Sequence, residues 1–142
     1  MMKRKHAHTS LRYATVIVWL HAIIMVLHGL SHVENGIWLS FFGDAFVSVV
    51  IVLAPLLALL FLHSRWLWSG ALLLALSLLS ALIFGLWNHF LVPGADNVAQ
   101  VPPGSWRLPF LITSILLALV EVVGTAIGVW CLYALAPSRA LR

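Results

Sequence analysis

Four long apolar runs constrain the fold of this chain more than any other feature of the sequence. A helix that crosses a hydrocarbon layer of about 30 Å needs about 20 mostly apolar residues. The runs of sufficient length are residues 13–32, 44–63, 66–91 and 108–135. They are joined by outer loops 33–43 and 92–107 and by a two-residue turn. We therefore expect an all-α membrane protein in which residues 1–142 form one four-span antiparallel transmembrane helical bundle.

The composition excludes several other classes of protein. Hydrophobic residues make up 63% of the chain and charged residues only 8%, whereas a soluble domain has about a quarter charged residues. A single cysteine rules out a disulfide framework and a cysteine-based metal site. The net charge is +4, but the basic residues lie at the ends of the apolar runs, so no nucleic-acid partner is expected. The expected partner is the lipid bilayer.

The distribution of basic residues predicts the orientation of the bundle. Cytoplasmic loops of membrane proteins carry an excess of Lys and Arg. In a four-span arrangement only Arg107 lies on the side of the two longer loops, and the others share the opposite side: Lys3, Arg4, Lys5, Arg12, Arg65, Arg139 and Arg142. We expect a multi-pass protein of the cell membrane, with both termini cytoplasmic.

Three histidines of the first span lie on one helix face. At about 100° per residue, His28 and His32 fall about 20° to either side of His21. Ionisable side chains within a span are costly, and those found there usually face the bundle interior and serve a function. This stripe of histidines, together with the polar residues at the end of the third span, is where function is expected.

The outer half of the bundle is predicted to hold a metal or a cofactor. His28 and His32 present two imidazoles one turn apart, and His89 supplies a third from another helix. Such a nitrogen set suits Fe, Cu or Zn, with Glu34 or Asp96 as a nearby carboxylate. Alternatively, a b-type haem would take axial ligands from the same histidines, and Arg107 would pair with a propionate.

A second polar pair is expected deeper in the membrane. Glu121 is the only carboxylate well inside a span, and counting residues from the outer helix ends places it at the depth of His21. A buried carboxylate requires a cationic or hydrogen-bonding partner. We therefore predict that His21 and Glu121 form a hydrogen bond, directly or through water, and act as an acid–base pair.

The sequence also predicts a helix cap in the second span and a site of close helix packing in the fourth. Asp44 is the expected N-cap of the second span. Gly124 and Gly128 form a small-xxx-small pattern, which favours close packing of helices. That packing lies either within the bundle or at the seam of a homo-oligomer or a larger membrane complex.

Three functions remain open at this point. The first is binding of a transition metal or haem through outer histidines, for redox chemistry or metal handling. The second is an enzyme that acts on a lipid-soluble substrate, such as a quinone, isoprenoid or sterol-like molecule, through His21 and Glu121. The third is an accessory structural subunit of a larger complex. Whether the chain is an enzyme is not decided by its sequence.

Overall fold

The computed structural model describes residues 2–135, with side chains from residue 8 onward, and contains helices but no strands in this range. The helical segments are α1 (Met2–Glu34), α2 (Phe41–Phe46), η1 (Val47–Leu53), α3 (Ala54–Leu62), α4 (Leu67–Leu86), η2 (Trp87–Leu91) and α5 (Arg107–Leu135). Here η denotes a π-helical stretch. The side chains of Lys3, Arg4 and Lys5, and all of Arg139 and Arg142, lie outside the described part.

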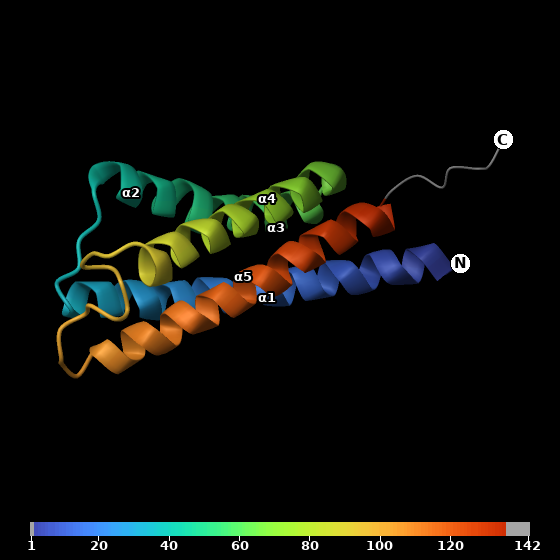
Figure 1. Cartoon of the computed structure of the whole chain (residues 1–142). Coiled ribbons are helices and arrows are strands. Elements are labelled where there is room, and N and C mark those ends of the chain that lie inside the picture. Colours follow the sequence, from blue (N-terminus) through green and yellow to red (C-terminus); the bar gives the residue numbers. More distant parts are fainter. Residues whose placement is uncertain (1, 136–142) are drawn as a thin grey trace.

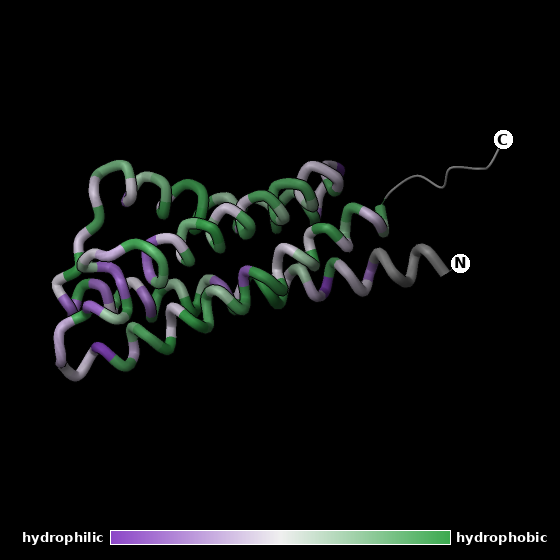
Figure 2. Tube along the Cα trace, in the orientation of Figure 1, coloured by the Kyte–Doolittle hydropathy of each residue, from purple (hydrophilic) through white to green (hydrophobic). Residues whose placement is uncertain are grey.

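Four continuous helical spans are long and apolar enough to cross a membrane, which confirms the expected helical class. They cover His8–Glu34, Phe41–Leu62, Leu67–Leu91 and Arg107–Leu135. Consecutive spans run in opposite directions, and the two longer loops lie at the end of the bundle remote from the N-terminus (Figure 1). Hydrophilic residues gather at this loop end (Figure 2).

Helix α5 lies at the centre of the packing, in contact with both α1 and α4, and α3 packs against α4. Gly124 and Gly128 are buried where α5 meets α4. A Cβ at Gly128 would fall 2.7 Å from the backbone nitrogen of Ala75, and one at Gly124 would meet the Leu78 side chain. The close approach that these glycines permit is therefore an approach to α4 of the same chain.

The second span departs from regular α-helix, and its first half, α2 and η1, has little contact with α1, whereas α3 packs against α1. Its N-cap is Ser40, whose hydroxyl accepts a hydrogen bond from the Gly43 N–H at 3.2 Å. The expectation that Asp44 is the cap was therefore wrong, and Asp44 lies in the first turn. The π-helical stretch η1 ends just before Pro55, which has no N–H to donate to the preceding turn.

Candidate metal centre

The C-terminal end of α1 presents two imidazoles, one turn apart, to the bundle interior. His28 is only 4% exposed, and His32 follows it at i+4. The helix stops two residues after His32, at a glycine cap. Gly36 has a positive φ of 66°, its N–H bonds to the Val33 carbonyl, and the next N–H bonds to the His32 carbonyl. This cap turns the chain away and leaves both histidines in the last turns of the helix.

The third imidazole comes from η2, the π-helical turn that ends the third span. His89 is 6% exposed and lies within this turn. The loop that follows folds back over it, because the Val98 N–H bonds to the His89 carbonyl at 3.0 Å and the Asn97 amide bonds to the Val92 carbonyl. Short π-helical stretches occur often at functional sites. Here the turn and its loop place His89 and Asp96 together.

Three imidazole nitrogens converge at this end of the bundle. His28 Nε2 lies 3.1 Å from His89 Nε2 and 3.1 Å from His32 Nε2. One nitrogen from each ring lies within 4.8 Å of the other two. The sequence had grouped these histidines by helix face and depth, and the structure brings all three together.

Hydrogen bonds on the outer side of two rings fix which nitrogen faces the cluster. The Thr113 hydroxyl donates to the Pro109 carbonyl at 2.7 Å, so it accepts from His28 Nδ1 at 2.9 Å. His89 Nδ1 donates to the Asp96 carbonyl at 3.1 Å. With Nδ1 carrying the hydrogen in both neutral rings, each Nε2 is left with a lone pair. Two lone pairs that face each other at this distance repel, and a cation or a proton between them would remove that repulsion.

Asp96 adds a negative charge beside the imidazoles. Its Oδ1 lies 3.1 Å from His89 Nδ1 and 3.3 Å from His32 Nε2, and its side chain is 14% exposed. Neither carboxylate oxygen makes a hydrogen bond in the described structure, although both are buried. Because Oδ1 lies beside Nδ1 of His89, Asp96 is placed to orient that ring, and its charge would offset that of a cation held by the cluster.

The nitrogen spacing suits a metal ion better than a haem. With metal–nitrogen bonds of about 2.0–2.1 Å, nitrogens 3.1 Å apart subtend about 95–100° at the metal, between octahedral and tetrahedral angles. Two axial haem ligands would instead stand about 4 Å apart, on opposite faces of the ring. Arg107, the expected propionate partner, is exposed at the start of α5 and does not line the cavity beside the cluster.

Phe110 shields the cluster from solvent. It is fully buried, stacks on His28 with ring centroids 5.1 Å apart, and meets His32 and His89 at tilted or edge-on angles. Neither Phe110 nor Thr113 was predicted from the sequence as part of the site. Depth along the helix could have identified Thr113 as a partner of His28, since each lies about six residues from the outer end of its helix.

The deeper polar pair lies where the matched depths placed it. His21 Nε2 is 3.4 Å from Glu121 Oε1, and both side chains are almost fully buried. The other carboxylate oxygen of Glu121 faces Gly85, because a Cβ there would lie 3.9 Å from Oε2 and 3.8 Å from His89 Cδ2. Glu121 therefore lies between His21 and the histidine cluster. Glu34, in contrast, is exposed at the end of α1 and is not part of the cluster.

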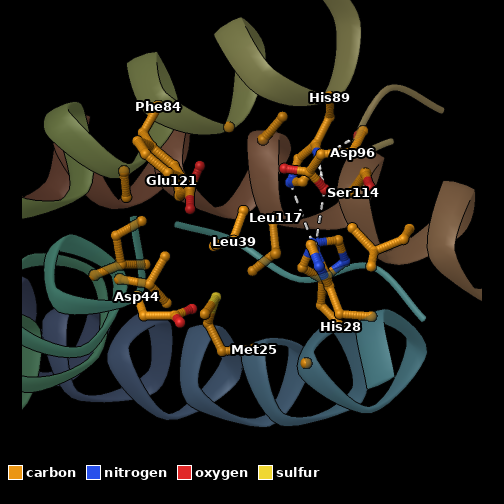
Figure 3. Close-up of a pocket in the computed structure, with 18 of the residues that line it drawn as sticks. Met25, His28, Leu39, Asp44, Phe84, His89, Asp96, Ser114, Leu117 and Glu121 are labelled. Atoms are coloured by element: carbon orange, nitrogen blue, oxygen red, sulfur yellow. Dashed lines mark hydrogen bonds and ion pairs between the residues drawn. The ribbon is translucent and has the colours of Figure 1, made fainter. Parts of the chain in front are cut away.

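A cavity of about 220 Å³ connects the cluster to Glu121. Figure 3 shows His28, His89 and Asp96 at one end of it, with Glu121 and Asp44 toward the other. The walls between these ends are mainly apolar, with Met25, Phe84 and Leu117 among them. The three imidazoles therefore line the cavity in addition to contacting one another.

Comparisons with known proteins assign neither a family nor a function to the chain. The chain matches no protein-family model, and neither the curated proteins nor the solved structures contain a match to it. The function is therefore inferred from the geometry of the site.

Proposed function

We propose that this chain is a multi-pass membrane protein that holds one transition-metal ion through His28, His32 and His89. The observation that carries the proposal is the convergence of the three imidazoles, with His28 Nε2 3.1 Å from a nitrogen of each of the other two rings. Imidazole ligands suit Zn, Cu and Fe. The buried Asp96 carboxylate, which makes no hydrogen bond in the described structure, supports a cation at the same place.

The metal centre is proposed to accept a further ligand. Three protein nitrogens with an open fourth position are typical of catalytic metal centres, whereas structural centres are closed by four protein ligands. The open side here is the cavity that His28, His32 and His89 line. This arrangement favours redox chemistry or metal handling over a purely structural ion.

His21 and Glu121 are proposed to hold a proton that compensates changes of charge at the centre. Glu121 lines the cavity beside the cluster, whereas His21 lines a second, more apolar cavity with Val52 and Pro55. A proton taken up from the first cavity would be shared between the carboxylate and the imidazole. Buried ionisable groups of this kind are common in membrane proton relays.

Both termini are proposed to be cytoplasmic, which places the metal centre in the outer half of the membrane. The support is the charge asymmetry of the sequence, in which only Arg107 lies on the loop side. Labelling of single cysteines in a Cys131→Ser background tests this orientation. A cysteine at Ala99 should react with an impermeant maleimide added to intact cells, and one at Ser64 should not.

Elemental mass spectrometry of the purified protein tests the metal centre. The protein is purified through a histidine-free affinity tag, dialysed against Zn, Cu or Fe(II), and freed of loosely bound ions. About one metal per chain is expected in wild type, and a loss of at least tenfold in His28→Ala, His32→Ala and His89→Ala. His63→Ala is the matched control, because His63 is an exposed histidine at the opposite end of the bundle.

The proposal fails if wild type binds none of the three metals, or if His63→Ala loses metal as the cluster variants do. The first outcome would leave two functions open, chemistry on a lipid-soluble substrate and an accessory structural role. The second would mean that metal binds adventitiously to surface histidines.

A further inference from the structure

The cavity beside the histidine cluster has polar groups at both ends and apolar walls between them. The histidines and Asp96 form one end, and Glu121 and Asp44 lie toward the other (Figure 3). The apolar lining includes Met25, Val47, Ile51, Phe84, Leu117 and Ala118. A ligand that fits this space needs hydrogen-bonding groups at opposite ends of a compact apolar body.

The cavity opens sideways between α1 and the start of the second span. Gly29 and Val33 of α1 line it from one side, and Leu39, Asp44 and Val47 line it from the other. These two segments have little direct contact with each other among the described residues. A Cβ at Gly29 would meet nothing within 4 Å, so the α1 side of the opening is not filled by side chains. A molecule dissolved in the bilayer can therefore enter at this depth.

The volume limits the part of a ligand that is enclosed. Sites for drug-sized ligands span about 300–1,000 Å³, and this cavity has about 220 Å³. It suits a single substituted ring, whereas the fused rings of a sterol would exceed it. An acyl chain would fill the volume but would leave Glu121 without a polar partner from the ligand.

We propose that the cavity binds the head group of a membrane quinone or hydroquinone, with its tail passing out between α1 and η1. One ring oxygen lies at the histidine end, and the opposite oxygen lies near Glu121 Oε2. The contact at the histidine end rests on the proposed metal centre. The apolar walls and the Glu121 contact do not depend on a metal.

Binding of a short-chain quinone to the protein in lipid nanodiscs tests the inference. The probe is ubiquinone-1, measured by equilibrium dialysis against empty nanodiscs, with metal content determined in the same samples. Ala118→Phe fills the cavity from α5, and Gly29→Phe fills its opening from α1. The matched control is Leu119→Phe, which adds a ring at the next residue of α5, where Leu119 is 59% exposed.

Wild type and Leu119→Phe are expected to bind one quinone per chain, and both filling variants to bind at least tenfold more weakly with unchanged metal content. Absence of saturable binding to wild type overturns the inference. Equal binding to the filling variants also overturns it, since the quinone then lies elsewhere or in the lipid. If wild type lacks metal but its quinone binding is sensitive to Ala118→Phe, the metal centre is wrong and the quinone site stands.

Discussion

His28 and His89 face each other through Nε2 atoms 3.1 Å apart, while both rings direct Nδ1 outward to oxygen acceptors. The outward bonds favour hydrogen on Nδ1 of each ring, and so they leave the inner nitrogens free to act as ligands in the proposed metal centre. Outer partners of this kind commonly tune metal affinity by about 10–100-fold. The Thr113 hydroxyl and the Asp96 carboxylate, whose Oδ1 also lies 3.1 Å from His89 Nδ1, can each be changed without touching a histidine.

Thr113→Val should weaken metal binding by about 10–100-fold, because the His28 ring loses the acceptor for its Nδ1–H. Competition with a chelator of known affinity measures the change. Thr125→Val is the matched control, since the Thr125 hydroxyl is buried without a hydrogen-bond partner in the described structure. Equal affinities in the two variants would contradict a role for Thr113 in orienting His28.

Asp96→Asn should lower metal affinity over a similar range of about 10–100-fold, because the side chain keeps its shape but loses the charge beside His89 and His32. The same chelator competition provides the readout. Glu34→Gln also removes one carboxylate charge at this end of the bundle, from an exposed position, and should have little effect. If both variants weaken binding alike, the effect of Asp96 is that of general surface charge.

His21 and Glu121 should show an energetic coupling of about 0.5–3 kcal/mol in a double-mutant cycle of unfolding. His21→Leu or Glu121→Leu alone leaves a buried polar group without its partner at 3.4 Å, whereas the double variant removes both. Each single variant should therefore be less stable than the double variant. Unfolding in mixed detergent micelles gives the four stabilities, and strictly additive values would refute the pairing.

Gly128→Val should destabilise the bundle by about 1–3 kcal/mol, because its Cβ would fall 2.7 Å from a backbone nitrogen of α4 that cannot rotate away. Gly29→Ala is the control, since a Cβ there meets nothing within 4 Å. Thermal unfolding of the two variants in the same detergent compares them. A wild-type melting temperature for Gly128→Val would mean that α4 and α5 are less closely packed than described.

The helical class of the chain was accessible from sequence because the length and hydropathy of a span follow directly from the thickness of the bilayer. The proximity of His28, His32 and His89 could be predicted from the sequence for a related reason. Depth along a helix is a count of residues, so groups at matched depth on interior faces become candidates for contact. The same count related His21 to Glu121.

The parts that the sequence did not reveal depend on the paths of individual backbone segments. Asp96 was one of two carboxylates predicted beside the imidazoles, but the choice between Asp96 and Glu34 was open. Asp96 reaches the cluster because its loop folds back through the Val98–His89 hydrogen bond, which has no signature in composition. Asp44 was mistaken for a cap because Ser40, four residues earlier, satisfies the helix end instead. Which helix faces which was also undetermined, so Phe110 and Thr113 could not be assigned to the histidines.

The π-helical turn that carries His89 makes the number of residues in the third span a determinant of the site. The Val92 N–H bonds to the Trp87 carbonyl, five residues back, so this turn holds one residue more than an α-helical turn. One residue corresponds to about 100° of rotation about an α-helix axis. A relative lacking one residue at Trp87 or Asn88 would keep its hydropathy and its histidine, yet the imidazole would point away from His28. Insertions and deletions here therefore distinguish functional relatives from chains that share only the spans.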